Sequence, residues 1–527
     1  EDVFYAGWDA TGNTPNISCG VHHPDGDFKI LNLDNDLASG CSFMGGTQYH
    51  WCVDWDEGGY SGGSAGAGLF DSQFKVVGQL SGGPGNCANG FEAFHGKFSA
   101  SFNAMKEWLD PDDTGTLVIN GTYEVLDSEL NVPGEYATIQ DAIDNAQDGA
   151  TVLVAPGIYS GDGYIDLNFE GKAITVISEA GPENTTIDCG GEERGITFEY
   201  GEDSTAVFDG FTITNGDRTD GGGIYIEASS PIIRNCIISN CSAGYMGGGI
   251  AISSDSNPTL MNVNVSGNTV DSFGGGISIN DSNPTLMNVN VYNNTADGFG
   301  GGIIITGDSN PFLSNVNIYG NTVESNGAGI SIRGGACPTL NNVSVFENTA
   351  IGQSGKGGGI RITGLGTNPI LYNVNVYNNS AVNGGGIYIY NEATPSLSNM
   401  HIYGNVAEAD GGGIHIYNET SPHLDNIAVY ENHAGEEGGG IYIYNKANPT
   451  LTNMTIWGND ASQGKAIWIF NESEVTVINS IISEGNPSIY VDGGTVILNI
   501  NYSDIVGGED EIFFDNGNSV INLSENI

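Results

Sequence analysis

Basic residues are scarce in this chain. Its 527 residues include only 13 Lys and Arg against 64 Asp and Glu, which gives a net charge of −51. Such a charge repels phosphate backbones and anionic lipid headgroups, so it argues against nucleic acid and membrane surfaces as partners. It favours cations, salty water or carbohydrate around the protein.

Long apolar runs and close cysteine pairs are also lacking. No apolar run reaches the about 18 residues that a membrane-spanning helix needs, and no Cys-x-x-Cys pair suggests a zinc site. Four of the eight cysteines (Cys19, Cys41, Cys52 and Cys87) lie near the N-terminus, which favours disulfides in an oxidising compartment. We therefore expect an extracellular or cell-surface protein. Cys236 and Cys241, further along, either pair or fill space.

A repeat of about 27 residues dominates the rest of the chain. An isoleucine that follows a glycine run recurs at Ile224, Ile250, Ile277, Ile303, Ile330, Ile360, Ile387, Ile414, Ile441 and Ile467. A period of this length is typical of stacked supersecondary units. Within one copy, Ile387 and Ile389 alternate with Tyr388 and Tyr390, and this period of two predicts a strand with one buried face.

No helical stripe occurs inside a repeat. Each copy predicts two clear strands, a weaker one near Ser396–Ser398, and corners rich in Gly or Asn. Leucine-rich repeats and propeller blades need other frames and lengths, so the pattern favours a right-handed parallel β-helix with one coil per repeat. The glycine runs predict positive φ or close backbone approach at a corner.

Asparagine recurs at two positions of the repeat. One column is Asn262, Asn288, Asn315, Asn342, Asn373, Asn399, Asn426 and Asn453, and the other is Asn268, Asn294, Asn321, Asn348, Asn379, Asn405, Asn432 and Asn459. Asn tolerates left-handed backbone and can bond the main chain at a corner. We interpret both columns as structural ladders, and Cys241 falls on a ladder position.

Aromatic residues recur in three outward columns. The first is Tyr388, His415, Tyr442 and Trp468; the second is Tyr390, Tyr417, Tyr444 and Phe470; the third is Tyr292, Tyr319, Phe346, Tyr377, Tyr403, Tyr430 and Trp457. Rings about 4.8 Å apart, the strand spacing, would form a flat platform. Such a platform either stabilises the coils or binds glycan or protein, and the first two columns are our candidate binding site.

Charged residues of the repeat offer weaker candidates. Arg333, Lys356 and Arg361 lie on neighbouring coils, and we interpret them as outward surface cations. Acids at corners include Asp220, Asp410, Glu436 and Glu437, which do not line up as a strand-face cluster. They are compatible with Ca²⁺, but no calcium motif is present, no metal ligand set is identified, and no other cofactor is indicated.

The start of the solenoid resembles a known family. VPGEYATIQDAIDNAQDGATVLVAPGIYSG, from Val132 to Gly161, predicts a helix near Thr138 to Ala146 followed by a strand and a turn. Together with the following GKAITVISEAGPENTTIDCGG it resembles the capping entry and first coils of the pectate-lyase-like β-helix proteins. That family includes lyases, hydrolases, adhesins and scaffolds, so the resemblance implies a fold rather than a function.

The first part of the chain lacks the repeat. YAGWDATGNTP, GVHHPDGDFKIL, HWCVDWDEGG and FKVVGQLSGGPGNC occur there in order. They resemble the C-terminal part of the lysyl-endopeptidase branch of chymotrypsin-like serine peptidases. In the segment that matches the family's nucleophile, Gly63-Ser64-Ala65, Ala65 stands where the catalytic serine belongs, and a methyl group cannot attack a carbonyl. The family's catalytic His and Asp lie upstream of the matched part.

We therefore expect an all-β protein of two domains: a partial trypsin-like barrel over 1–124, and a right-handed parallel β-helix over 125–527 with a cap at about 132–160 and regular coils from about 221 to 475. The first function hypothesis is a non-enzymatic scaffold for adhesion or filament assembly, through self-association or other cell-surface proteins. The second is an active secreted peptidase whose N-terminal half is missing here. The third is a β-helix that binds or degrades polysaccharide.

Overall fold

The computed structural model describes residues 129–485, 487–515 and 519–524, and shorter segments between 4 and 123. The chain divides into two compact units, Glu1–Leu126 and Asp127–Ile527. Each unit is described by itself.

The N-terminal unit contains an antiparallel sheet with the strand path β4-β3-β7-β8-β9-β6-β5. The bounds are β3 (Ser18–His22), β4 (Ile30–Asp34), β5 (Ser39–Cys41), β6 (His50–Asp54), β7 (Gly68–Asp71), β8 (Val76–Gly82) and β9 (Glu92–Lys97). Ala38, Trp51, Val53, Leu69 and Val77 form a small core. Gly63, Ser64, Ala65 and Cys87 lie outside the described residues, as do the side chains of the other three N-terminal cysteines.

A short helix closes the N-terminal end of the solenoid. Helix α2 (Ile139–Asn145) begins after Thr138, whose hydroxyl accepts a hydrogen bond from the Asp141 backbone N–H. Its apolar face buries Ile139, Ala142 and Ile143. The helix predicted from the sequence is therefore confirmed, and it covers the end of a core that would otherwise be open to water.

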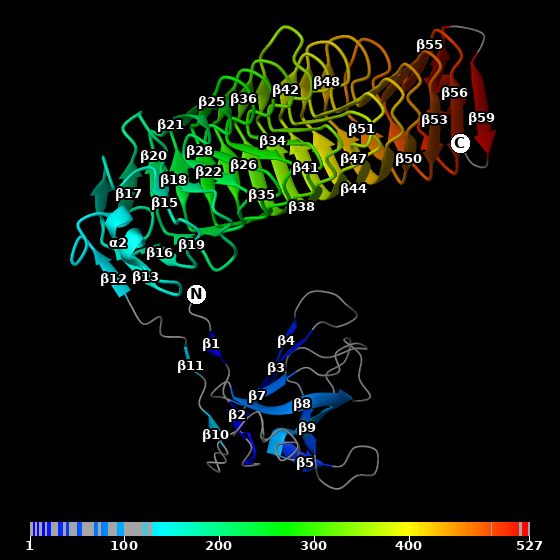
Figure 1. Ribbon diagram of the computed structural model, residues 1–527. Helices are drawn as coiled ribbons and strands as arrows, with labels where there is room; N and C mark the ends of the chain where they lie inside the picture. Colours follow the sequence, from blue (N-terminus) through cyan, green and yellow to red (C-terminus); the bar gives the residue numbers. More distant parts are fainter. Residues whose placement is uncertain are drawn as a thin grey trace. The chain divides into compact units, whose positions relative to one another are not determined.

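The solenoid itself is built from three parallel sheets (Figure 1), which we call sheets 1, 2 and 3. Sheet 1 has 25 strands, sheet 2 has 14 and sheet 3 has nine among the described residues. In sheet 1 most coils supply two short strands, whereas five coils supply one strand of eight residues: β35 (Phe312–Tyr319), β38 (Thr339–Phe346), β41 (Ile370–Tyr377), β44 (Ser396–Tyr403) and β47 (His423–Tyr430). The weak strand expected near Ser396–Ser398 is thus the first part of β44.

Sheet 2 takes one strand from each of 14 coils, and sheet 3 takes one strand from each of nine. Sheet 2 comprises β15 (Leu167–Asn168), β18 (Ile196–Phe198), β22 (Ile224–Glu227), β26 (Ile250–Ser253), β30 (Ile277–Asn280), β34 (Ile303–Thr306), β37 (Ile330–Arg333), β40 (Ile360–Thr363), β43 (Ile387–Tyr390), β46 (Ile414–Tyr417), β49 (Ile441–Tyr444), β52 (Ile467–Phe470), β55 (Ile489–Asp492) and β58 (Ile512–Phe514). Sheet 3 comprises β21 (Asp217–Asp220), β25 (Ser242–Met246), β29 (Thr269–Val270), β33 (Thr295–Ala296), β36 (Thr322–Val323), β39 (Thr349–Ala350), β42 (Ser380–Ala381), β45 (Val406–Ala407) and β48 (His433–Ala434).

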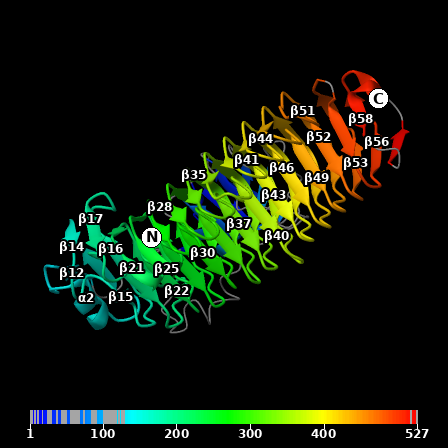
Figure 2. The same ribbon diagram turned by 90° about the horizontal axis from the view of Figure 1, so that it is seen from above.

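The repeat sets the register between coils. Ile387 pairs with Ile414 and Ile414 with Ile441, so equivalent residues stack along the axis. Figure 2 shows the successive strands β43, β46 and β49 of sheet 2 side by side. The inward side chains merge into one continuous apolar core from the cap to the last coils. The right-handed parallel β-helix predicted from the repeat is confirmed.

The buried asparagine ladder ties successive coils together. Asn348 is fully buried, its Nδ2 donates to Asn379 Oδ1 and to the Ile318 carbonyl, and its Oδ1 accepts from both the backbone N–H and Nδ2 of Asn321. The other members repeat this pattern, and the ladder ends where Asn459 donates to the Glu484 carboxylate at 2.8 Å. Cys241 takes the first ladder position, where its N–H donates to Asn268 Oδ1.

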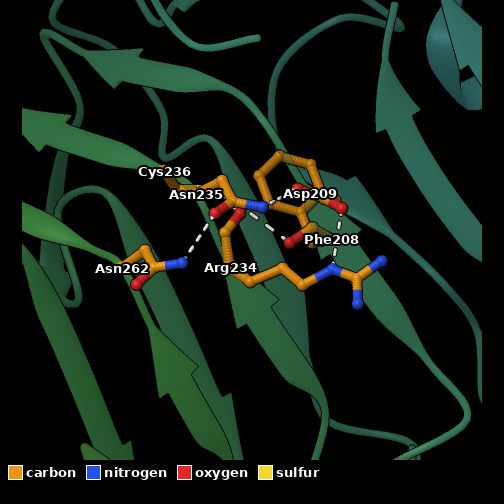
Figure 3. Close-up of polar contacts among 6 residues, drawn as sticks. All are labelled: Phe208, Asp209, Arg234, Asn235, Cys236 and Asn262. Carbon is orange, nitrogen blue, oxygen red and sulfur yellow. Dashed lines mark hydrogen bonds and ion pairs between the residues drawn. The ribbon is translucent and has the colours of Figure 1, made fainter. Parts of the chain in front are cut away.

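The other asparagine ladder is exposed and runs in the opposite sense. Asn262 Nδ2 donates to Asn235 Oδ1 of the preceding coil, and Asn235 in turn donates to Asp209 (Figure 3). Asp209, which is 7% exposed, also accepts from Arg234 Nε at 2.7 Å. Each ladder therefore ends on a carboxylate at its acceptor end, because a carboxylate accepts without needing to donate. Cys236 stays a free, buried thiol beside this cluster.

Candidate functional site

A corner between sheets 3 and 2 shapes the outer surface of sheet 2. The residue before each glycine run stacks along the axis, and we call these residues the corner column: Asp220, Met246, Phe273, Phe299, Asn326, Lys356, Asn383, Asp410, Glu437 and Gln463. The first glycine of the run has positive φ and lies directly over the next strand. A Cβ on Gly411 (φ +69°) would come within 2.7 Å of His415 Cβ, so only glycine fits there.

This corner covers the first aromatic column. Tyr388, His415, Tyr442 and Trp468 do form a column, with ring centroids 4.4 to 4.6 Å apart. Tyr442 and Trp468 are stacked, whereas the His415 ring is tilted by 34° and 37° to its two neighbours. Their exposed fractions are only 2%, 5%, 7% and 3%, respectively. The expectation that this column presents an open binding surface is therefore wrong, because the glycine-rich corner of each coil folds over it. Burial also lowers the pKa of His415 to about 3, so the imidazole is neutral in ordinary buffers.

The second column is half-buried and borders the covered one. Tyr390, Tyr417, Tyr444 and Phe470 stack at 5.1 to 5.9 Å with planes within 7° of parallel. The third column stacks at 4.2 to 4.9 Å on the outer side of sheet 1. Rings stacked in this way cover one another's faces. They present edges and phenol hydroxyls rather than the flat platform that the sequence suggested.

Three cations gather beside these rings. Arg333 Cζ lies 4.8 Å from the Phe273 ring and 4.7 Å from the Phe299 ring, and Lys356 Nζ lies 5.6 Å from the Tyr388 ring. Arg361 is only 9% exposed, and burial followed by the charge of Arg333 lowers its pKa to about 10. The interpretation of Arg361 as an ordinary surface cation is therefore wrong, since the corner packs so closely that a Cβ added to Gly357 would lie 3.0 Å from Arg361 Cβ.

An acidic pair lies further along the same corner column. Asp410 and Glu437 occupy equivalent positions in adjacent coils, and Gly411 N–H donates to the Glu437 carbonyl at 3.0 Å. Desolvation followed by the charge of Glu436 raises the pKa of Asp410 to about 6, and desolvation followed by the charge of Asp410 raises that of Glu437 to about 7. The corner stacks these two acids because they precede Gly411 and Gly438. They lie outside the strands, so the prediction that the corner acids do not line up as a strand-face cluster is not contradicted.

Polar atoms without partners concentrate on this side of the solenoid. The corner column, together with the outward residues of sheet 2, is called the strip. Among the described residues, six of the eleven buried side-chain polar atoms that lack a hydrogen bond lie in the strip: Asp220 Oδ1, Ser278 Oγ, Asn326 Oδ1, Arg361 Nε, Asp410 Oδ1 and Trp468 Nε1. Native proteins satisfy nearly all such groups, so this concentration marks the strip as the candidate site. From the sequence, the residues of the strip were separate candidates. The signal that identifies the corner column is the alignment of the residues that precede the glycine runs.

The described residues offer no assembled metal site. No group of three His, Cys, Asp or Glu side chains within that part of the chain is placed to hold an ion, so Ca²⁺ stays an untested expectation. Within the described segments, no helix has both the length and the apolar character for crossing a membrane.

Comparison with known proteins places the chain by its repeats. The model described as "right handed beta helix region" matches residues 176–345, 301–424 and 358–527, which together span 176–527. The chain therefore belongs to the right-handed β-helix family. Residues 1–96 match the model described as "lysyl endopeptidase, C-terminal domain". This match supports the resemblance proposed for the first unit and leaves the nucleophile position untested.

Solved structures with a similar fold include three with different activities. The catalytic unit of a thermostable GH87 α-1,3-glucanase from Streptomyces thermodiastaticus is 13% identical over 90% of this chain and 88% of its own, with a TM-score of 0.42. Pectate lyase Pel9A is 14% identical over 66% and 71%, with a TM-score of 0.31. The Siphovirus 9NA tailspike receptor binding domain is 11% identical over 76% and 78%, with a TM-score of 0.27. Likenesses this distant carry no information about function.

Proposed function

We propose that the protein binds polysaccharide along the strip on the outer side of sheet 2. The observation that carries this proposal is the concentration of buried polar atoms without partners in the strip. Those atoms are of both kinds: Trp468 Nε1 and Arg361 Nε are donors, whereas Asp410 Oδ1 and Asn326 Oδ1 are acceptors. Sugar hydroxyls both donate and accept, so an extended glycan suits a strip whose polar groups are of both kinds.

The form of the strip supports a polymer rather than a small ligand. Equivalent residues repeat at the strand spacing of about 4.8 Å, and the half-buried second column borders the corner over four coils, from Tyr390 to Phe470. Phenol edges and hydroxyls of Tyr417 and Tyr444 would contact the ligand there. We propose an extracellular or cell-surface setting, in keeping with the acidic composition. Binding without turnover also fits the scaffold or adhesion role suggested by Ala65.

The test removes hydroxyls without disturbing the stack. A Tyr417→Phe/Tyr444→Phe variant of the full chain is compared with wild type by affinity electrophoresis in a panel of neutral and acidic polysaccharides. Two lost hydrogen bonds at about 0.5–1.5 kcal/mol each sum to about 1–3 kcal/mol, which predicts roughly 5- to 150-fold weaker binding. The matched control, Tyr403→Phe/Tyr430→Phe in the third column, keeps wild-type affinity. If no polysaccharide retards the wild-type protein, the proposal fails.

Hydrolysis of the bound glycan is a second candidate function. Glycosidases use two carboxyl groups, one kept protonated by its surroundings, and those of retaining enzymes lie about 5–5.5 Å apart. Asp410 and Glu437 are adjacent acids with raised pKa values in the strip, and adjacent coils are about 4.8 Å apart. Hydrolysis predicts release of reducing ends that Asp410→Asn and Glu437→Gln each abolish, and unchanged polymer length after prolonged incubation excludes it.

A further inference from the structure

Arg333, Lys356 and Arg361 are unusual among the cations of this chain. The protein has 64 acidic residues and only 13 basic ones. Within the described segments, none of the three lies within ion-pair distance of a carboxylate. Arg234 and Lys446 do have acidic partners: Asp209 for the first, Glu419 and Glu472 for the second. In so acidic a protein, three neighbouring cations without a carboxylate call for an explanation.

The three cations come from neighbouring places in the strip. Arg333 ends β37, Arg361 lies in β40, and Lys356 belongs to the corner column between them. The charge of Arg333 adds to burial in lowering the pKa of Arg361, and the charge of Arg361 does the same to the pKa of Lys356. Like charges held this close repel one another, so the cluster is poorly suited to stabilising the fold by itself.

Arg361 is the most deeply placed of the three. It is 9% exposed, its Nη1 donates to Ser331 Oγ at 3.4 Å, and its Nε has no partner among the described residues. Its Cζ lies 5.1 Å from the Phe299 ring and 6.0 Å from the Tyr390 ring. Aromatic rings contact the face of a guanidinium and leave its N–H groups in the plane available. Those N–H groups match an oxyanion.

We infer that Arg333, Lys356 and Arg361 form a subsite for an oxyanion carried by the ligand, namely a carboxylate or a sulfate ester on an acidic polysaccharide. This inference rests on the proposed function and narrows its ligand class. An oxyanion would accept hydrogen bonds from those N–H groups of the three cations that reach the surface, and it would offset their mutual repulsion. The strip would then hold an acidic sugar beside β37 and β40, where the three cations locally oppose the repulsion that the net charge of −51 exerts on an anion, and neighbouring sugars along the later coils.

A purely structural role for Arg361 and a role in binding an oxyanion predict opposite effects on stability when the side chain is replaced. A cation that holds the fold together destabilises the protein when it is removed. A buried cation that awaits a ligand is a cost to the free protein, so an apolar side chain of similar size should stabilise the fold. Arg361→Met therefore separates the two roles, and Lys446→Met is the matched control because its cation is already paired.

The experiment uses the full-length chain with three polymers at about 0.15 M salt: polygalacturonate, dextran sulfate and unmodified dextran. We expect wild type to bind at least one charged polymer about tenfold more tightly than dextran, and the preferred polymer distinguishes carboxylate from sulfate. Arg361→Met should abolish this preference and raise the apparent melting temperature of the free protein by roughly 2–4 °C. Lys446→Met should retain the preference and show no such rise.

Other results would refute either the oxyanion subsite or the proposed polysaccharide binding, and they distinguish the two. If Arg361→Met keeps the preference, or melts below wild type, the oxyanion subsite is refuted. If dextran binds as tightly as the charged polymers and Tyr417→Phe/Tyr444→Phe weakens it, the polysaccharide proposal survives and the subsite does not. If no polymer binds, yet sulfate ion raises the melting temperature of wild type and not of Arg361→Met, the anion site survives and the polysaccharide proposal fails.

Discussion

Replacing Asn348 with Ala tests whether the buried ladder holds the coils together. The change removes the amide that bonds both Asn321 and Asn379. The Asn321 backbone N–H and Nδ2 then lose their acceptor, and the Ile318 carbonyl loses a donor at 3.0 Å. A buried polar group left without a partner costs about 1–3 kcal/mol. Water that enters the vacated space recovers part of this, so we expect a loss of about 3–5 kcal/mol.

The measurement must be local, because each coil of a solenoid contacts only its neighbours and opens in part. Native-state hydrogen exchange followed by mass spectrometry should show faster exchange in β35 and β38 and little change near the cap. The matched control in the same coil is Asn342→Gly. Asn342 is exposed, bonds Asn315 and Asn373, and has a φ of +55° that glycine adopts freely.

The control should cost less than about 1 kcal/mol, because water replaces the partners of exposed amides. Equal loss of protection in Asn348→Ala and Asn342→Gly would refute the reasoning. So would a loss below about 1 kcal/mol in Asn348→Ala, since the ladder would then be a consequence of the repeat and not a source of its stability.

Two further predictions concern the corner beside the strip. Asp410 and Glu437 have folded pKa values of about 6 and 7, above the ordinary values of 3.8 and 4.5; the folded state therefore holds more protons between about pH 4 and pH 7, and stability should fall as pH rises through that window. Melting temperatures measured from pH 5 to 8 should show this fall, and a similar fall in Asp410→Asn/Glu437→Gln would exclude the pair as its source. Gly438→Ala should lower the free energy of thermal unfolding by at least about 2 kcal/mol, because φ is +65° and the new Cβ would lie 2.8 Å from Tyr442 Cβ. The control Gly190→Ala, with φ +67° and no atom within 4 Å, should cost only about 1 kcal/mol of backbone strain. Equal costs for the two variants would contradict the steric argument.

The repeat made the fold predictable to the level of register. The alternation around Ile387 places one face inward, and a constant period stacks equivalent residues, so both the core and the asparagine ladders follow from spacing. The cap was predictable as well, because Thr138 supplies an N-cap before the amphipathic segment of α2. In a coiled repeat, residues one period apart in the sequence lie side by side in adjacent coils. The repeat pattern therefore also predicts the contacts between coils.

The binding surface was less predictable. Alternation assigns Tyr388 and Tyr390 to the same outward side of β43, yet Tyr388 is 2% exposed and Tyr390 is half-buried. The difference arises from Gly384, which packs so closely over Tyr388 that a Cβ added to Gly384 would lie 2.9 Å from Tyr388 Cβ. The alternation of residues distinguishes only inward from outward side chains. It does not predict that a corner folds back over the outward face of the sheet.

The order of residues along the chain thus determined the coil, its core and its ladders, because equal spacing forces equivalent side chains into columns. The tertiary structure alone decided which outward columns meet water and that the rings of the second column stack face to face. It also decided that Arg361 lies buried with no ion-pair partner among the described residues. Those facts depend on how corners pack over strands and on how desolvation changes the free energy of a charge. The sequence pattern of a single repeat predicts neither the packing of corners over strands nor the desolvation of a buried charge.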